Sequence, residues 1–260
     1  METVFFKYQG TGNDFILIDN RLQTFQASAD QIASLCHRRF GIGADGLICL
    51  EHGPEGFDFQ MVYYNADGHE SSMCGNGGRC LVQFAHDLGI IATQTRFLAI
   101  DGPHEATVTP DVISLKMMDV VDIHEETTHF FLQTGSPHYV AFVPDVTSYA
   151  VATSGASIRY APEWVAKGGT NVNFVECKSD QTLFVRTYER GVEDETLSCG
   201  TGVTACALAT HLAKGWPSPI QIQTLGGTLS VAFEKSPSGF HNIYLTGPAK
   251  QVFSGTISIV

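Results

Sequence analysis

Positively charged residues are scarce in this sequence of 260 residues. Lys and Arg number 15 against 27 Asp and Glu, the formal net charge is −12, and no basic cluster is longer than the segment HRRF at 37–40. Because a nucleic-acid partner requires a basic surface, this composition argues against nucleic-acid binding. The acidic balance favours solubility and says little about the fold.

Long apolar runs are also missing. No apolar segment approaches the roughly 20 residues of a membrane-spanning helix, and the N-terminus lacks the charged and apolar segments of a secretory signal. The seven cysteines are an odd number, scattered over a chain of medium length, which argues against a secreted disulfide scaffold. We therefore expect a protein of the reducing cytoplasm, with free thiols and no membrane partner.

Many short strand-like segments and few helical ones are present. Apolar residues make up 43% of the sequence, which suits one large domain or two of roughly 120–130 residues. Runs rich in β-branched and aromatic residues predict strands over residues 3–9, 15–19, 46–50, 57–65, 105–109 and 112–117. Helical periodicity predicts helices over residues 28–40, 77–89 and 202–215. The last helix is apolar nearly all round, so we expect it at the centre of a domain.

Two segments in opposite halves of the chain resemble one another. Residues 71–80 are SSMCGNGGRC and residues 196–206 are TLSCGTGVTAC, each with a cysteine directly before Gly-x-Gly. A predicted strand ending in tyrosine and a polar turn with glycine precede both. We therefore predict two similar αβ halves with a boundary near residues 117–126. The N-terminal half is expected at 1–118, with the C-terminal segment 250–260 as a candidate addition, and the second half at 119–249.

The segment GIGADG, Gly41–Gly46, has the G-x-G-x-x-G spacing of a dinucleotide-binding loop. That loop requires a strand before it and a helix after it, so that the pyrophosphate meets the helix N-terminus. Here a predicted helix precedes the segment and a predicted strand follows it. The order argues against a dinucleotide site.

The cysteines fall into two groups. Cys74 and Cys199 precede predicted helices, where unpaired amides and the helix dipole favour negative charge and lower a thiol pKa. The glycines after them let a ligand approach the backbone, so the amides at 75–76 and 200–201 can hold a carboxylate. The other cysteines are expected to be small buried hydrophobic residues, namely Cys36, Cys49, Cys80, Cys177 and Cys206.

A carboxylate shared by two such helix ends would place its α-carbon between two sulfurs, which is the geometry of an amino-acid racemase. Inversion requires removal of a proton from one face and return of a proton to the other, and a thiolate and a thiol can divide these tasks without a cofactor. The amides would stabilise the enediolate-like charge.

Other thiol chemistries fit less well. A four-cysteine zinc site uses C-x₂₋₄-C pairs and a dithiol redox module uses C-x-x-C, whereas five or six residues separate the cysteines of these two segments. A cysteine hydrolase needs a histidine partner, and His138 is a candidate. A single nucleophile would leave the second Cys-Gly-x-Gly segment unexplained.

A set of motifs makes nearly the whole chain resemble the diaminopimelate epimerase family. They are GTGNDF (10–15), GIGADGL (41–47), NADGHESSMCGNGGRC (65–80), GSPH (135–138), NVNFVE (171–176), YERGVEDETLSCGTG (188–202) and LGGTL (225–229). Proline racemases are similar only in the two-cysteine layout, with histidine where this chain has Asn76. Phenazine-biosynthesis relatives share the fold of the family but lack the cysteine pair.

The resemblance implies an α/β (α+β) fold of two pseudo-symmetric halves. Each half would be a curled, mostly antiparallel sheet around a central helix, with the active site in the cleft between them. It also implies a homodimeric epimerase without cofactor or metal, which interconverts LL- and meso-2,6-diaminopimelate on the route to lysine and peptidoglycan.

The site residues that the resemblance implies are as follows. Cys74 and Cys199 would be the catalytic acid and base, and His138 and Glu189 would tune their pKa values. Arg190 can bind a distal carboxylate bidentately, and Glu189 can accept from the distal ammonium. The positions that would hold the substrate are Asn13, Asn65, Gly75, Asn76, Asn171, Glu189, Arg190, Gly200 and Thr201.

Two positions depart from the family pattern. Ser136 stands where many members have asparagine and Gly46 where many have glutamine. In such members the asparagine and the glutamine both contact substrate.

Two alternative functions stay open. One is an epimerase of a proline-like amino acid, and the other is a non-catalytic thiol protein in which Cys74 and Cys199 form a disulfide.

Overall fold

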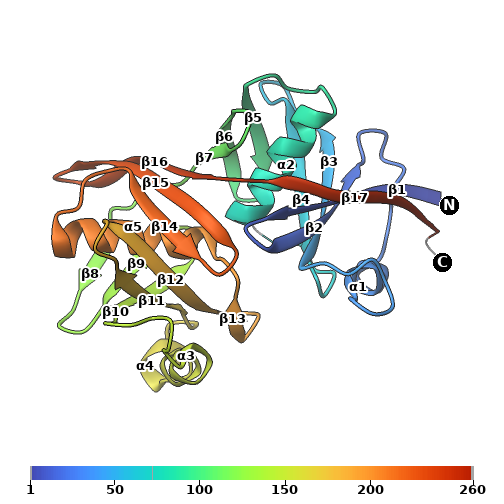
Figure 1. Ribbon diagram of the computed structural model, residues 1–260. Coiled ribbons are helices and arrows are strands. Elements are labelled where there is room, and N and C mark those ends of the chain that lie inside the picture. Colours follow the sequence, from blue (N-terminus) through green and yellow to red (C-terminus); the bar gives the residue numbers. More distant parts are fainter. Residues whose placement is uncertain (1, 72, 259–260) are drawn as a thin grey trace. The chain divides into compact units, whose positions relative to one another are not determined.

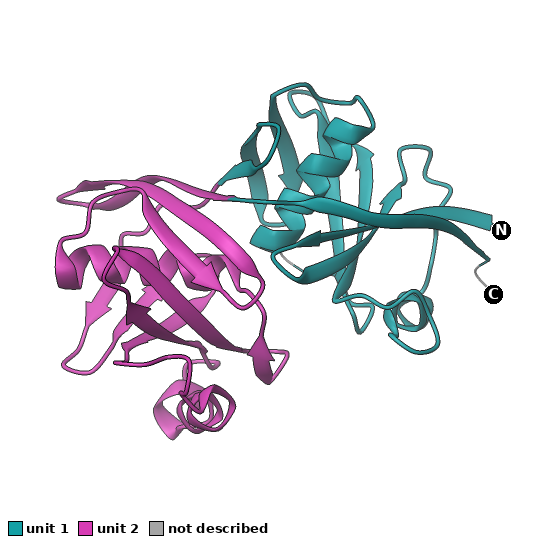
Figure 2. Cartoon of the chain, viewed as in Figure 1, with its two compact units in different colours: residues 1–115, 247–260 teal, residues 116–246 magenta. Residues whose placement is uncertain are grey.

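The computed structural model describes residues 2–71 and 73–258. The chain divides into two compact units (Figure 2): unit 1 comprises residues 1–115 and 247–260, and unit 2 comprises residues 116–246. None of the helices in the described part of the chain has the length and apolar character needed to cross a membrane.

Unit 1 is built on a mixed, mostly antiparallel set of strands (Figure 1). Neighbouring strands follow the order β17-β1-β2-β3-β4-β5-β6-β7, in which the pairs β2–β3 and β4–β5 are parallel and the others antiparallel. The strand bounds are β1 (Glu2–Gly10), β2 (Asn13–Asp19), β3 (Gly46–His52), β4 (Phe59–Asn65), β5 (Gln94–Ala99), β6 (Gly102–Val108), β7 (Ile113–Lys116) and β17 (Lys250–Ser258).

The helix α2 (Gly75–Asp87) forms the core of unit 1 together with these strands. It is buried from Gly75 to Val82, including its glycine-rich first turn. A Cβ added at Gly77 would lie 3.1 Å from Ile48 Cδ1 and 3.4 Å from the ring of Phe15. Glycine therefore lets the start of α2 approach β2 and β3 closely.

Unit 2 repeats this plan (Figure 1). Its strands follow the order β8-β9-β10-β11-β12-β14-β15-β16, in which β10–β11 and β12–β14 are parallel and the others antiparallel, and β13 pairs with β12. The strand bounds are β8 (Ile123–Glu125), β9 (Phe130–Gln133), β10 (Pro137–Phe142), β11 (Asn171–Cys177), β12 (Thr182–Glu189), β13 (Asp194–Thr196), β14 (Ile220–Thr224), β15 (Gly227–Ser236) and β16 (Gly239–Gly247).

The two units share one topology. In each, an antiparallel pair is followed by a parallel pair, an antiparallel pair, a central helix, a second parallel pair and two antiparallel pairs. The central helix of unit 2 is α5 (Gly200–Lys214), which is buried from Gly202 to Thr210. The predicted fold class of two pseudo-symmetric αβ halves is confirmed, as is the burial of the apolar helix.

The other helices depart in part from the prediction. α1 (Ala29–Cys36) begins at the predicted Ser28 cap but ends four residues early, because His37 adopts an extended conformation. Two helices were not predicted, α3 (Val151–Arg159) and α4 (Pro162–Val165). The GIGADG segment lies between α1 and β3, in the order that the sequence predicts.

Candidate active site

Cys74 and Cys199 occupy equivalent positions in the two units. Each is the N-cap residue of the central helix, with an extended backbone (φ −93°, ψ 130° at Cys74; φ −121°, ψ 113° at Cys199). The first-turn amides of a helix lack intrahelical partners, and together with the helix dipole they favour negative charge near the cap. Cys74 is half-buried and Cys199 is buried.

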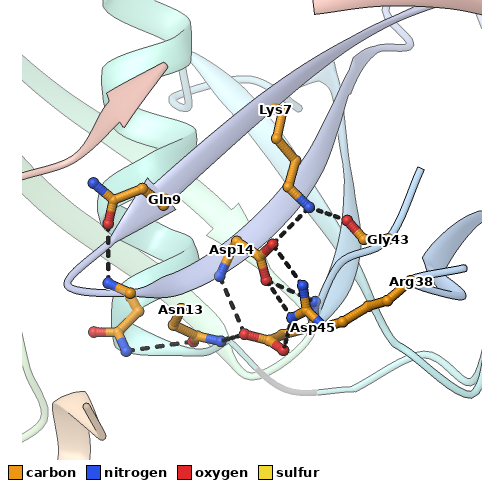
Figure 3. Close-up of polar contacts among 9 residues, drawn as sticks. Lys7, Gln9, Asn13, Asp14, Arg38, Gly43 and Asp45 are labelled. Carbon is orange, nitrogen blue, oxygen red and sulfur yellow. Dashed lines mark hydrogen bonds and ion pairs between the residues drawn. The ribbon is translucent and has the colours of Figure 1, made fainter. Parts of the chain in front are cut away.

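One asparagine contacts the sulfur of Cys74, and a second asparagine binds the first. Asn13 Oδ1, at the start of β2, lies 3.6 Å from Cys74 Sγ and also accepts a hydrogen bond from Asn76 Nδ2 at 3.3 Å. Asn13 Nδ2 donates to a carboxylate oxygen of Asp45 at 2.5 Å (Figure 3). Both asparagines were predicted from the sequence but Asp45 was not, because its segment GIGADG was considered only as a dinucleotide-binding loop and as a family motif.

A charged network surrounds Asp45 (Figure 3). Arg38 binds Asp14 through two nitrogens, at 2.7 and 3.0 Å, and reaches Asp45 at 2.6 Å. The buried Lys7 pairs with Asp14 at 2.7 Å and also donates to the Gly43 carbonyl. Burial raises the pKa of Asp14, but hydrogen bonds from Arg38 and Lys7 outweigh it and hold the pKa at about 2. Asp14 therefore remains an anion at neutral pH.

Arg79 lies on the first turns of α2 and is fully buried. Its Nη2 donates to Asn76 Oδ1 at 2.9 Å and to Thr11 Oγ1 at 3.3 Å, and its Nη1 lies 3.4 Å from the Gly75 carbonyl. Burial lowers the pKa of Arg79, whereas the sulfurs of Cys80 and Cys74 act in the opposite direction. Arg79 was not predicted from the sequence, although an arginine among the apolar residues of a predicted helix is a detectable signal.

The sulfur of Cys199 faces a hydroxyl group. Thr201 Oγ1 lies 3.5 Å from Cys199 Sγ, 2.9 Å from His138 Nε2 and 3.2 Å from Ser136 Oγ. Ser136 Oγ in turn lies 2.9 Å from His138 Nε2. These residues come from the β9–β10 turn, from β10 and from α5, so the fold of unit 2 brings them together.

His138 is a neutral donor in this arrangement. Burial and the nearby charge of Arg190 lower its pKa to about 3. Asn173 Nδ2 donates to the Tyr139 carbonyl and faces His138 Nδ1 at 3.1 Å, so Nδ1 accepts and the proton resides on Nε2. His138 therefore donates to the Thr201 and Ser136 hydroxyls. Asn173 was not among the site residues predicted from the sequence.

Asn171 ties several of the named residues together. Its Nδ2 donates to Ser136 Oγ at 3.2 Å and to the Pro137 carbonyl at 3.0 Å, while its Oδ1 accepts from the Arg190 backbone at 2.9 Å. The Arg190 side chain is exposed, and its Nη1 donates to the Gly168 carbonyl at 3.1 Å. Glu189, half-buried at the end of β12, accepts from Thr196 Oγ1 at 2.8 Å.

The remaining predicted positions lie at the ends of these elements. Gly75 and Gly200 are the first residues of α2 and α5 and are buried. Asn65 ends β4, is exposed, and forms a backbone turn with Gly68 and His69. A Cβ added at Gly46 would lie 2.6 Å from the Tyr63 ring and from the Tyr64 carbonyl. The glutamine of other members therefore has no room here unless Tyr63 and the backbone move.

The other cysteines are buried apart from Cys177, which is half-buried rather than buried as expected. Burial raises the pKa of Cys36 to about 11 and that of Cys80 to about 12, so both are protonated at neutral pH. All seven cysteines are free thiols. Within residues 2–71 and 73–258, no group of three or more His, Cys, Asp or Glu side chains has an arrangement suited to a metal ion.

Comparison with protein families gives a match over most of the chain. The protein-family model described as diaminopimelate epimerase matches residues 5–121 and 130–252. A diaminopimelate epimerase of Flavobacterium psychrophilum is 53% identical over 255 residues, covering 97% of this chain and 99% of the relative. Those of Chlorobaculum tepidum and Aquifex aeolicus are 45% and 40% identical, covering 96% and 98% of this chain and 99% and 97% of the relatives.

Solved structures of low sequence identity share the fold. A PhzF-family phenazine biosynthesis protein of Bacillus anthracis superposes with a TM-score of 0.80 at 11% identity, covering all of both chains. A hydroxyproline epimerase of Agrobacterium vitis, with bound trans-4-hydroxy-L-proline, gives a TM-score of 0.70 at 15% identity, covering 98% of this chain and 92% of the other.

Proposed function

The chain belongs to the diaminopimelate epimerase family, and we propose that it interconverts LL- and meso-2,6-diaminopimelate through Cys74 and Cys199. An enzyme of this family is an isomerase that acts on a small amino acid. The reaction inverts one α-carbon, so a proton must leave one face of that carbon and a proton must arrive at the other.

In the proposed reaction the two thiols divide the proton transfers. The thiolate of one cysteine takes the α-proton, and the electron pair of the broken C–H bond passes into the α-carboxylate. The thiol of the other cysteine then gives its proton to the opposite face of the same carbon. The first cysteine ends as a thiol and the second as a thiolate, so the reverse reaction uses the same groups with exchanged roles. These transfers need no cofactor.

Helix ends supply the electrostatic part of the proposal. The amides after Cys74 and Cys199, at residues 75–76 and 200–201, are suited to bind the substrate α-carboxylate. Charge that develops on this carboxylate during proton removal is then stabilised by amides that are already oriented. The half-buried and buried surroundings of the two cysteines strengthen these interactions, because water screens them less.

The remaining roles concern the distal end of the substrate and the thiols. We assign the carboxylate of that end to the exposed Arg190 and its ammonium group to Glu189, with Asn13, Asn65, Asn76, Asn171 and Thr201 as further contacts. His138, as a neutral donor to Thr201, acts on Cys199 through a hydrogen bond rather than through a charge. Glu189 is the second residue that we propose to affect the thiols.

The single observation that carries this proposal is the matching position of the two cysteines. Each is the N-cap residue of a buried helix at the same point of the same strand order. A protein that used one nucleophile would not need this feature in both units.

Proton NMR of LL-diaminopimelate in D₂O tests the proposal. With reduced wild-type protein, the α-proton signal is expected to fade as the meso isomer appears. Cys74→Ser and Cys199→Ser are each expected to lose turnover by at least about 10³-fold, since each removes one of two required groups. The matched control is Cys177→Ser, a half-buried thiol outside the site, which should retain turnover.

Other results would support the alternatives. Exchange with proline or hydroxyproline, but not with diaminopimelate, would indicate an epimerase of another amino acid. No exchange, combined with a Cys74–Cys199 disulfide whose reduction lowers the melting temperature, would indicate a non-catalytic thiol protein.

We also propose that the enzyme is a cytoplasmic homodimer. Both statements rest on the family resemblance. Light scattering after size-exclusion chromatography is expected to give twice the chain mass of 28.2 kDa, and a single chain mass would contradict the dimer.

A further inference from the structure

A line of hydrogen bonds connects two charged residues through the site of Cys74. Asp45 accepts from Asn13 Nδ2 at 2.5 Å, and Asn13 Oδ1 receives Asn76 Nδ2 at 3.3 Å and the Cys74 sulfur at 3.6 Å. At the other end, Arg79 Nη2 donates to Asn76 Oδ1 at 2.9 Å. The two asparagine side chains thus lie between an anion and a cation.

The charged residues determine which way the two amides face. An asparagine amide has nearly the same shape after a half-turn, so packing alone does not choose between its oxygen and its nitrogen. A carboxylate only accepts, which requires Asn13 to present its NH₂ group to Asp45. A guanidinium only donates, which requires Asn76 to present its oxygen to Arg79. Both requirements leave Asn13 Oδ1 facing Asn76 Nδ2 and the Cys74 sulfur.

Asp45 is itself held in place (Figure 3). Arg38 Nη2 binds Asp45 Oδ1 at 2.6 Å, and the Asp14 backbone amide donates to Asp45 Oδ2 at 3.2 Å. The same Arg38 is fixed by its two bonds to Asp14, which Lys7 also contacts. The oxygen that meets Asn13 therefore belongs to a carboxylate with two further donors, although the Asp45 side chain is 41% exposed.

We propose that Asp45 is a positioning residue for Cys74, which holds Asn13 with its carbonyl oxygen toward the sulfur, while Arg79 holds Asn76 in the matching orientation. In this orientation Asn13 accepts from the thiol and orients its S–H group. With Asn13 turned over, an N–H would face the sulfur and favour the thiolate instead. The inference rests on the proposed function in that Cys74 is taken as catalytic, but its main test needs no substrate.

The charged groups around Cys74 act in different directions. Arg79 on α2 favours the thiolate, whereas the negative charge of Asp45, which meets Asn13, disfavours it. Asp14 is a further anion of this network, and Cys80 on α2 is a protonated thiol at neutral pH. Removing the charge of Asp45 would therefore also favour the thiolate. A test of positioning has to separate this charge effect from the turning of Asn13.

The test is the pH dependence of alkylation of Cys74 by iodoacetamide, followed by mass spectrometry of the peptide that contains it. In Asp45→Asn the new amide can donate or accept, so Asn13 is free to turn. The midpoint of the alkylation profile is expected to fall by about 0.5–1 pH unit relative to wild type. Because Asp45 is exposed, the variant is expected to fold, and its thermal midpoint verifies this.

A double-mutant cycle with Asn13→Ala distinguishes positioning from charge. If Asp45 acts through Asn13, Asp45→Asn should move the midpoint of the alkylation profile less than half as far in the Asn13→Ala background as in the wild-type background. The control is Asp19→Asn, which removes a carboxylate of the same unit that pairs with Arg21 at 2.7 Å, and it should leave the midpoint unchanged. An equal shift in both backgrounds would assign the effect to charge and overturn the proposal, as would no shift in a folded Asp45→Asn protein.

Turnover gives a second, independent measurement. Asp45→Asn is expected to lower kcat about tenfold, or roughly 1.4 kcal/mol, with a change in KM of less than about threefold, because a mispositioned thiol affects proton transfer more than substrate binding. If wild type proves inactive on diaminopimelate while the alkylation cycle behaves as expected, the proposed function fails and the positioning role stands. If wild type is active and the alkylation cycle shows no coupling, the positioning role fails and the proposed function stands.

Discussion

Arg79 carries a positive charge inside unit 1, and no carboxylate among residues 2–71 and 73–258 forms an ion pair with it. Its side chain is fully buried, and its Nε is one of two buried side-chain polar atoms without a hydrogen-bond partner in the described residues. The acceptors of its guanidinium are the uncharged Asn76 Oδ1, Thr11 Oγ1 and Gly75 carbonyl. A buried cation of this kind contributes little to stability, so we infer that Arg79 is retained for the site around Cys74.

Replacement of Arg79 tests this inference against a structural arginine. Arg79→Met is expected to cost about 1 kcal/mol of unfolding free energy or less, since the lost hydrogen bonds are offset by the desolvation that a cation no longer suffers. The control is Arg186→Met. Arg186 pairs with both oxygens of Glu195 at 2.6 Å and with three backbone carbonyls, so its loss is expected to cost about 3–5 kcal/mol.

Urea unfolding and turnover of the two variants measure the outcome. Arg79→Met should lose more activity than Arg186→Met once both are compared as folded protein. Equal losses of stability would contradict a role at the site and make Arg79 a structural residue.

At the scale of elements, the start of α1 illustrates local sequence control. Ser28 accepts a hydrogen bond from the Gln31 amide, and the Gln31 side chain accepts from the Ser28 amide, which completes a capping box. The sequence predicted this helix start from Ser28. Such a prediction is possible because the cap involves only residues that lie within three positions of one another.

Ser28→Ala is expected to lower the unfolding free energy by about 1 kcal/mol, because amides of the first turn lose their acceptor. Ser34→Ala, on an exposed position within the same helix, removes the same hydroxyl without touching the cap. Chemical denaturation should show a change of less than about 0.5 kcal/mol for this control. A similar loss in both variants would contradict the capping role.

The missed helix α3 shows where local signals fail. Its sequence, VATSGASIR, contains a glycine and β-branched residues that disfavour helices. Gly155 is required by packing, since an added Cβ would lie 2.3 Å from Tyr188 Cβ on β12. The close approach of β12 thus requires glycine at position 155, although glycine disfavours a helix. This requirement comes from a distant part of the chain, so the local sequence does not reveal it.

For the whole molecule, the acidic composition affects stability toward acid. Folding lowers the pKa of several carboxyl groups, among them Asp14, Asp19 and Asp101. A carboxyl group whose pKa is lower in the folded state stabilises the protein above its unfolded pKa, and this contribution is lost as the pH falls through the folded pKa. Asp14, at about 2 against an ordinary 3.8, contributes over the window from about pH 4 down to pH 2.

Wild type and Asp14→Asn are expected to converge in stability as the pH falls. Their difference in unfolding free energy should shrink by about 2 kcal/mol between pH 5 and pH 2. Urea unfolding at both pH values measures it. A difference that is independent of pH would mean that folding does not lower the pKa of Asp14.

The sequence by itself determined the repeated cysteine segments, the central helices and the family, because each depends on residues close together along the chain. The two Cys-Gly-x-Gly segments form the N-caps and first turns of the buried helices α2 and α5, and the family match covers residues 5–121 and 130–252. Only the tertiary structure decided what faces the sulfurs. Asp45 meets Asn13 and His138 meets Thr201 because strand register and helix packing bring them together across long stretches of chain. An asparagine in a turn or a histidine after proline has no local property that identifies such a partner.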